Sequence, residues 1–301
     1  MNAVYIEITD VCNLNCSFCP CGKANSSAVS LSANRPREFM STELFERCIT
    51  EAATVAENVY FHVLGEPTLH PGFGQFLKRL EQTPLKLNLT TNGTTIARVS
   101  ERILKSPAVR QVNFSTHAYA ELPQDDAMRH LQDVLDFCKM ANAIRPDLYI
   151  NLRLWNVGDE ASEAWNRTML AKINEAFGTQ LAPGNFCSRH KSFPVVERIY
   201  LHQDSRFEWP ILDERRKTRD ERNATGTCRA LDTHVAILHD ERVVACCLDY
   251  SGQITLGNIT DQSLAEILET PLARNLREGF EKHELRHPLC QSCSFCKRFG
   301  K

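Results

Sequence analysis

The chain has 301 residues, of which 43% are hydrophobic and 24% are charged, and its formal net charge is −2. This is the composition of a globular protein with a sizeable core. The near-neutral charge argues against a nucleic-acid partner, and no apolar run reaches the roughly 18 residues of a membrane span. The N-terminus lacks the basic and apolar segments of a signal peptide, so we expect a cytoplasmic protein with no membrane partner.

The first 200 residues alternate between strand-like and helix-like patterns. Strands separated by helices imply a parallel sheet with right-handed crossovers. We therefore expect an α/β fold with its active-site loops at the carboxyl ends of the strands. The six predicted strands are Val4–Thr9, Val59–Leu64, Leu85–Thr90, Gln111–Ser115, Tyr149–Trp155 and Arg198–His202, and the helices lie near 42–57, 73–82, 95–105, 125–143 and 161–177.

The pattern changes after residue 202. Charged residues dominate 203–227, which we interpret as a linker or a solvated helix face. Beyond them, two short strands precede a helix that opens with a capping box, Ser263 to Glu266. Much earlier in the chain, residues 20–40 are predicted to form a flexible insertion that borders the substrate entrance. The predicted organisation is a domain at 1–202, a linker at 203–227 and a small α+β domain at 228–301.

The 13 cysteines gather at the two ends of the chain. A reducing cytosol disfavours disulfides, so two clusters of cysteines indicate two metal centres. Three scattered cysteines, Cys48, Cys138 and Cys187, are expected to be small buried hydrophobic residues.

The N-terminal group places Cys12, Cys16 and Cys19 in the loop that follows the first strand. Three thiolates are one too few to close a four-coordinate structural site or to hold every iron of a four-iron cluster. One iron would stay open to an outside ligand, which predicts a reaction centre. The alternative is a zinc knuckle with Cys21 as its fourth ligand; otherwise Cys21 is a free thiol of the loop.

The spacing of these cysteines, with Phe18 before the third, resembles the radical S-adenosylmethionine (radical SAM) superfamily. The resemblance implies a partial (β/α)6 TIM-like barrel and a [4Fe-4S] cluster on Cys12, Cys16 and Cys19. It further implies that S-adenosylmethionine (AdoMet) binds the open iron and is reductively cleaved. The product is a 5′-deoxyadenosyl radical that abstracts hydrogen from the substrate.

Other motifs follow the later strands. The turn Gly65-Glu66-Pro67 resembles the family motif that holds the AdoMet amino group, with Leu64 in place of its first glycine. Each motif also has a structural interpretation, as a turn or a satisfied core side chain. The resemblance implies AdoMet contacts from Phe18, Gly65, Glu66, Pro67, Thr91, Asn92, Ser115, His117, Arg153 and Asn156.

The C-terminal cysteines resemble the twitch, or truncated SPASM, domain of radical SAM enzymes. That domain carries an auxiliary [4Fe-4S] cluster, and the implied ligands are Cys228, Cys246, Cys290 and Cys293. Cys293 and Cys296 form an equally spaced pair, which leaves Cys296 open as a substitute ligand. The alternative is a structural zinc site.

The combined resemblance implies a radical SAM oxidoreductase or epimerase with two [4Fe-4S] clusters and AdoMet. The expected substrate is a peptide, an amino sugar or another small molecule, and the expected reductant is a flavodoxin or ferredoxin. The auxiliary cluster would assist oxidation or epimerisation. In an epimerase Cys247 would donate the hydrogen atom, and otherwise it is an inert buried cysteine. Two other functions stay open: a non-catalytic zinc or iron–sulfur protein for electron transfer or interaction, and an RNA-modifying radical SAM enzyme.

Overall fold

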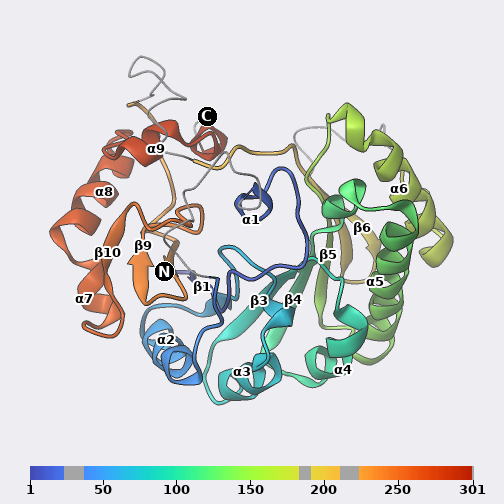
Figure 1. The fold of residues 1–301 in the computed structure, drawn as a ribbon, viewed down its shortest axis with the longest axis horizontal. Coiled ribbons are helices and arrows are strands. Elements are labelled where there is room, and N and C mark those ends of the chain that lie inside the picture. The colour runs from blue at the N-terminus through green and yellow to red at the C-terminus, as the bar shows by residue number, and fades with distance from the viewer. Residues whose placement is uncertain (24–36, 183–190, 211–223, 300–301) are drawn as a thin grey trace. The chain divides into compact units, whose positions relative to one another are not determined.

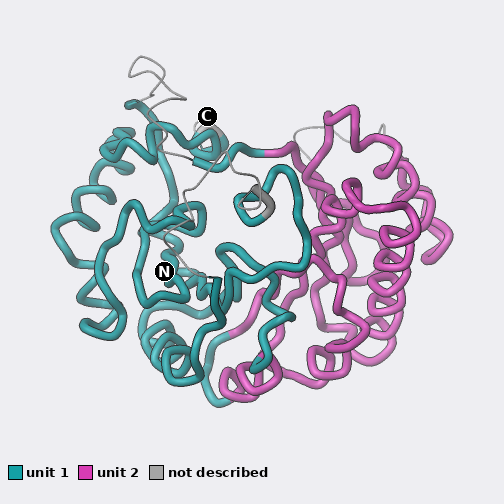
Figure 2. The backbone as a smooth tube through the Cα atoms, viewed as in Figure 1, with its two compact units in different colours: residues 1–72, 82–85, 207–301 teal, residues 73–81, 86–206 magenta. Residues whose placement is uncertain are grey.

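The structure is a computed structural model that describes residues 1–23, 37–182, 191–210 and 224–299 (Figure 1). Its contacts divide the chain into two compact units, which are described separately (Figure 2). Unit 1 contains residues 1–72, 82–85 and 207–301, and unit 2 contains residues 73–81 and 86–206. Within the described residues, no helix is both long and apolar enough to cross a membrane.

The sheet of unit 1 has the strand order β10-β9-β8-β1-β2. Strand β1 lies between two parallel partners, β2 and β8, while β8, β9 and β10 are successively antiparallel. Val4 and Ile6 of β1 are fully buried, so this strand forms the centre of the unit's core. The strands are β1 (Ala3–Ile6), β2 (Asn58–Tyr60), β8 (His234–Ile237), β9 (Arg242–Val244) and β10 (Thr255–Asn258).

Two helix caps in unit 1 follow directly from the sequence. Ser41 caps α2 by accepting a hydrogen bond from the Leu44 N–H at 3.1 Å. Ser263 and Glu266 form the capping box of α7 that the sequence predicts. The helices are α1 (Pro20–Lys23), α2 (Thr42–Val55), α7 (Leu264–Leu268), α8 (Pro271–Glu281) and α9 (Pro288–Ser292), with 3₁₀ turns η1 (Pro67–Leu69) and η6 (Phe295–Arg298).

The sheet of unit 2 has the strand order β3-β4-β5-β7-β6. Strands β3, β4, β5 and β7 are parallel, and only β6 is antiparallel to its neighbour β7. The strands are β3 (Lys86–Thr91), β4 (Val109–Phe114), β5 (Tyr149–Leu154), β6 (Ser192–Val196) and β7 (Ile199–Gln203). The helices are α3 (Phe73–Leu80), α4 (Ile96–Lys105), α5 (Gln124–Ile144) and α6 (Glu163–Phe177), with 3₁₀ turns η2 (Thr116–Glu121) and η3 (Glu160–Ser162).

The six predicted strands of the first 200 residues are all present, as β1 to β5 and β7, and the five predicted helices are α2 to α6. Strand β6 was not predicted, because Pro194 interrupts its pattern; proline is tolerated here since β6 lies at the edge of the sheet. Cys48 and Cys138 are fully buried, as predicted. Cys187, most of the predicted insertion and much of the predicted linker lie outside the described residues.

Strand β8 joins the C-terminal segment to the sheet of β1. Val235, Ala236 and Ile237 are fully buried, which is typical of a parallel strand covered on both faces. The predicted domain boundaries stay a prediction.

Candidate functional site

The loop after β1 presents three partly exposed thiols, those of Cys12, Cys16 and Cys19. The Cys19 N–H donates to the Cys16 carbonyl oxygen at 3.1 Å, which tightens the loop between them. The Cys12 sulfur accepts the Leu14 N–H at 3.5 Å. Backbone N–H groups aimed at cysteine sulfur are among the features that tune iron–sulfur clusters, so this donor set fits such a cluster.

Cys21 differs from those three cysteines. It lies on α1 rather than in the loop, it is buried, and its thiol donates to the Asp10 carbonyl oxygen at 3.6 Å. The hydrogen bond with Cys19 and burial raise the pKa of the Cys21 thiol well above its ordinary range. Cys21 is thus held as a buried hydrogen-bond donor on α1, apart from the three partly exposed thiols of the loop.

The Gly65-Glu66-Pro67 turn is docked on the start of the cysteine loop. The Glu66 N–H donates to the Val11 carbonyl oxygen at 2.8 Å. Gly65 has φ +73°, and a Cβ at this position would lie 2.2 Å from the Thr9 carbonyl oxygen. Only glycine fits here, so the motif's glycine is required by the close approach of two backbones.

Glu66 is almost fully buried, and its Oε1 accepts from both the N–H (3.0 Å) and the hydroxyl (2.6 Å) of Thr68. The carboxylate therefore caps the η1 turn that begins at Pro67. These two hydrogen bonds hold the buried Glu66 carboxylate in one orientation beside the cysteine loop.

The C-terminal cysteines come from three segments of unit 1, of which the first, before β8, carries Cys228. Cys246 and Cys247 follow β9, Cys290 lies on α9, and Cys293 ends that helix. Burial raises the pKa of Cys228 to about 11, and the charges of Cys293 and Cys296 add to the effect. Burial likewise raises the pKa of Cys246, with contributions from Cys247, Cys228 and Cys290. Among the described residues, no three or more His, Cys, Asp or Glu side chains are arranged to hold a single metal ion.

Two hydrogen bonds distinguish members of this group. The Cys228 sulfur accepts the Ala230 N–H at 3.5 Å, as the Cys12 sulfur accepts that of Leu14. The buried Cys296 thiol instead donates to the Cys293 carbonyl oxygen at 2.9 Å. The Cys228 sulfur thus accepts a hydrogen bond, whereas the Cys296 thiol carries a proton and donates one.

Asp249 fixes the loop that follows Cys246 and Cys247. Its carboxylate is buried and accepts the N–H groups of Gln253 (2.8 Å) and Ile254 (2.6 Å). This loop carries a residue that sequence reasoning missed, Tyr250, whose pKa is raised to about 12 by burial and by the nearby Cys19 charge. The signal in the sequence was an aromatic residue three positions after the Cys246-Cys247 pair.

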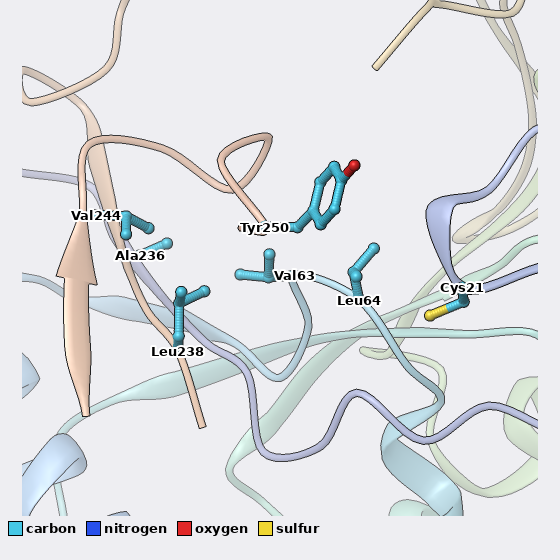
Figure 3. Close-up of a cluster of buried hydrophobic side chains, with 7 residues drawn as sticks. All are labelled: Cys21, Val63, Leu64, Ala236, Leu238, Val244 and Tyr250. Carbon is cyan, nitrogen blue, oxygen red and sulfur yellow. The ribbon is translucent and has the colours of Figure 1, made fainter. Parts of the chain in front are cut away.

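An apolar cluster borders both groups of cysteines. It consists of Cys21, Val63, Leu64, Ala236, Leu238, Val244 and Tyr250 (Figure 3). Cys12 and Cys19 from the first group and Cys247 from the second pack against it. A hydrogen bond with Tyr5 lowers the pKa of Cys247, but burial outweighs it and raises the value to about 12. The thiol of Cys247 is thus protonated at neutral pH.

Six of the predicted AdoMet contacts lie in unit 2, at the carboxyl ends of β3, β4 and β5. Thr91 and Asn92 form a turn in which their side-chain oxygens accept the N–H groups of Gly93 and Thr94, each at 3.0 Å. The Ser115 N–H donates to the Thr91 carbonyl oxygen at 2.9 Å, which joins the ends of β3 and β4.

His117 is a buried neutral histidine. Burial lowers its pKa to about 4, and its Nδ1 lies 3.2 Å from the Arg153 carbonyl oxygen. Its ring stacks on Trp155, and the Arg153 guanidinium lies 4.7 Å from the centre of the same indole. These residues form one layer at the end of β5, and each already has a partner inside the protein.

Asn156 is different, because its fully buried side chain has no hydrogen-bond partner for either Nδ2 or Oδ1 in the part of the chain that the structure describes. Buried amide groups are nearly always paired, so two orphaned atoms on one side chain suit a polar ligand such as AdoMet. Gln203, which sequence reasoning missed, is also buried, and its Oε1 has no partner among the residues that the structure describes. The signal in the sequence was the position of Gln203 directly after the sixth predicted strand.

Comparisons with known proteins agree with this geometry. The model of the radical SAM superfamily matches residues 6–159, about half of the chain. The model of the SPASM iron–sulfur cluster-binding domain matches residues 228–297. The GTP 3′,8-cyclase of Vibrio cholerae is 33% identical over 96 residues, which are 31% of this chain and 27% of that protein. The matched part therefore spans about a quarter of that relative.

Two solved structures share the fold. BtrN in complex with AdoMet and 2-DOIA is 15% identical, with a TM-score of 0.53 over 98% of this chain and 93% of that chain. Native anSMEcpe with bound AdoMet and the Cp18Cys peptide is 16% identical, with a TM-score of 0.56 over 98% and 87%. The α/β fold is thus that of a radical SAM partial barrel with C-terminal auxiliary strands and helices. The chain belongs to the radical SAM superfamily and carries a C-terminal SPASM iron–sulfur domain.

Proposed function

We propose that this protein uses AdoMet to abstract a hydrogen atom from an unactivated carbon of a peptide or of a small molecule such as an amino sugar. One observation supports this most directly. The loop after β1 presents three partly exposed thiols beside the docked Gly65-Glu66-Pro67 turn, while a fourth thiol, that of Cys21, is buried and hydrogen-bonded. Three thiolates leave one iron of a four-iron cluster open to an outside ligand.

The proposed cluster ligands are those that the sequence suggests. Cys12, Cys16 and Cys19 would hold the N-terminal [4Fe-4S] cluster, and Cys228, Cys246, Cys290 and Cys293 would hold the auxiliary cluster. The donation from the Cys296 thiol to a carbonyl oxygen supports leaving Cys296 out of the auxiliary set. With four protein ligands the auxiliary cluster is closed, which suits an electron relay in a domain proposed to cover residues 228–301.

AdoMet, if bound and cleaved after one-electron reduction, would supply the 5′-deoxyadenosyl radical. The chain's part is to bind and orient AdoMet and to exclude water. Glu66 would accept hydrogen bonds from the amino group, because its carboxylate is buried and fixed by Thr68. Asn156 would satisfy its two unpaired polar atoms on AdoMet. The remaining proposed contacts are Phe18, Gly65, Pro67, Thr91, Asn92, Ser115, His117 and Arg153.

The substrate class and the type of reaction are proposed by analogy with solved structures. BtrN is solved with 2-DOIA, and anSMEcpe with a peptide, so both small molecules and peptides are compatible with this fold. We propose oxidation, with the auxiliary cluster taking the second electron, or epimerisation, with the Cys247 thiol returning a hydrogen atom. A flavodoxin or ferredoxin would supply the first electron.

Anaerobic reconstitution tests the proposal. We expect about eight irons and eight sulfides per chain, and formation of 5′-deoxyadenosine when AdoMet and a strong reductant are added. The triple variant Cys12→Ser/Cys16→Ser/Cys19→Ser should keep about four irons and form no 5′-deoxyadenosine, whereas Cys21→Ser should retain both properties. Zinc without iron would instead support the non-catalytic interpretation and refute the enzyme proposal.

Cys247→Ala separates the two outcomes once a substrate is known. We expect it to keep full iron content and AdoMet cleavage. If the enzyme is an epimerase, this variant should lose product formation; unchanged turnover would remove Cys247 as the hydrogen donor.

A further inference from the structure

The carboxylate of Glu7, directly after β1, is fully buried and bonded to two distant loops of unit 1. Its Oε1 accepts the Leu64 N–H at 3.1 Å, and its Oε2 accepts the His239 N–H at 3.3 Å. The three segments so joined follow β1, β2 and β8, whose carboxyl ends lie side by side because these strands are parallel neighbours. One side chain therefore ties together three loops.

A second contact connects two of the same segments. Asp10 is buried; its Oδ1 accepts the Glu38 N–H at 2.9 Å, and its Oδ2 lies 3.3 Å from Nε2 of His239. The carbonyl oxygen of Asp10 also accepts the Cys21 thiol. His239 is thus held through its backbone by Glu7, and its ring lies against Asp10 of the same segment.

Each of the three loops leads directly to groups of the candidate site. The segment after Glu7 and Asp10 carries Cys12, Cys16 and Cys19. Leu64 immediately precedes Gly65 and Glu66. The turn at His239 leads through β9 to Cys246 and Cys247. Displacement of the Glu7 carboxylate would therefore move elements of both cysteine groups.

The buried Glu7 carboxylate does more than fill space in the core. A buried carboxylate costs free energy unless it is hydrogen-bonded, and an apolar side chain would fill the same space without that cost. What an apolar side chain lacks is the ability to fix two backbone N–H groups in direction as well as in distance.

We propose that Glu7 is a positioning residue that holds the N-terminal cysteine loop, the Gly65-Glu66-Pro67 turn and the β8–β9 turn in register, and so sets the environment of the N-terminal cluster. This inference rests on the proposed function, because it assumes that the cluster is present. Glu7 acts through the loops and contributes no ligand.

The test compares Glu7→Gln with Glu51→Gln in the reconstituted holoenzyme. Glu51 is the matched control, because it is also a buried carboxylate of unit 1 that accepts a backbone N–H, that of Leu264 at 2.9 Å, but it lies on α2. Iron content, the electron paramagnetic resonance spectrum of the reduced protein with and without AdoMet, and amide exchange of the peptides containing Leu64 and His239 are measured for both variants.

For Glu7→Gln we expect full iron content, an altered signal from the AdoMet-responsive cluster, and exchange on the order of tenfold faster in at least one of the two peptides, since glutamine offers one acceptor oxygen where the carboxylate offers two. Glu51→Gln should match the wild type. A wild-type spectrum together with wild-type exchange in Glu7→Gln would overturn the inference.

If Glu7→Gln does not fold, Glu7→Asp replaces it, because that variant keeps a carboxylate but shortens the side chain that reaches the N–H groups of Leu64 and His239. We expect an altered signal with full iron content, and an unaltered signal would again refute the positioning role. A wild-type protein with no AdoMet-responsive cluster would instead refute the proposed function, which distinguishes the two failures.

Discussion

Gly65 shows at the scale of one residue why the turn after β2 has its sequence. Its φ is +73°, and a Cβ at this position would come within 2.2 Å of the Thr9 carbonyl oxygen, which leaves no room for a side chain. Gly178 also has a positive φ, +67°, but nothing lies within 4 Å of a Cβ placed there. Comparing the two glycines therefore separates the cost of a positive φ from the cost of a steric clash with the neighbouring backbone.

We expect Gly65→Ala to lower the free energy of unfolding by about 2–4 kcal/mol, and Gly178→Ala by about 1 kcal/mol. Urea denaturation of the metal-free protein measures both. Gly65→Ala should also reduce iron binding, because the turn is docked on the cysteine loop. Equal losses in the two variants would show that the contact with Thr9 does not matter.

Asn156 and Asn113 form a second pair, both asparagines of unit 2 that are fully buried. Asn113 accepts from Gln111 (2.8 Å) and Asn151 (2.9 Å) and donates to the Leu89 carbonyl oxygen (3.2 Å). Asn156 has no partner for its side-chain polar atoms among the described residues. A paired amide stabilises the fold, and an unpaired one does not.

We therefore expect Asn156→Ala to change the free energy of unfolding by less than about 1 kcal/mol and to weaken AdoMet binding about tenfold. Asn113→Ala should lower the free energy of unfolding by about 2 kcal/mol or more. Urea denaturation and equilibrium dialysis with AdoMet measure the two effects. Unchanged AdoMet affinity in Asn156→Ala would remove this residue from the proposed contacts.

The loop between β9 and β10 illustrates the scale of the element. Asp249 accepts two backbone N–H groups there, so its carboxylate shapes the segment that carries Cys246 and Cys247. Asparagine has nearly the same shape but offers one acceptor oxygen instead of two. Asp147, an exposed partner of Arg145 in unit 2, provides a control.

For Asp249→Asn we expect a loss of about 1–3 kcal/mol of stability and a reconstituted iron content that falls from about eight toward about four, because only the auxiliary site is disturbed. Asp147→Asn should change neither quantity measurably. Iron analysis and thermal denaturation give the result, and full iron content in Asp249→Asn would contradict the assigned role.

At the scale of the whole molecule, two neutral histidines make folding depend on pH. Burial lowers the pKa of His117 to about 4 and that of His234 to about 4, against an ordinary value near 6.5. Below pH 6.5 these two histidines take up protons in the unfolded chain but stay neutral in the folded protein until the pH approaches 4. Stability is therefore fully present above about 6.5 and is lost as the pH falls toward 4.

Each of these histidines should remove up to about 1.4 kcal/mol of stability per pH unit in this window. We expect His117→Asn to flatten the dependence by about that amount between pH 6.5 and 5. Urea denaturation of the metal-free protein at several pH values measures the slope. A slope equal to that of the wild type would show that His117 is protonated in the folded protein.

Local patterns carried the prediction of the parallel strands and helices of the first 200 residues, because hydrophobic alternation and helical periodicity are readable within short windows. The same holds for the capping box at Ser263, whose two partners are three residues apart. Strand β6 escaped prediction because Pro194 is permitted only by its place at the sheet edge, which a local pattern does not reveal.

By itself the sequence predicted the chemistry of the site, because Cys12, Cys16 and Cys19 lie in one loop and three thiolates are one too few to hold every iron of a four-iron cluster. It did not reveal that Glu7 would bind His239, 232 residues away, or that β8 would lie beside β1. Nor did it show that Asn156 would be buried without partners among the described residues. Those facts depend on contacts between distant segments, which only the packing of the folded chain decides.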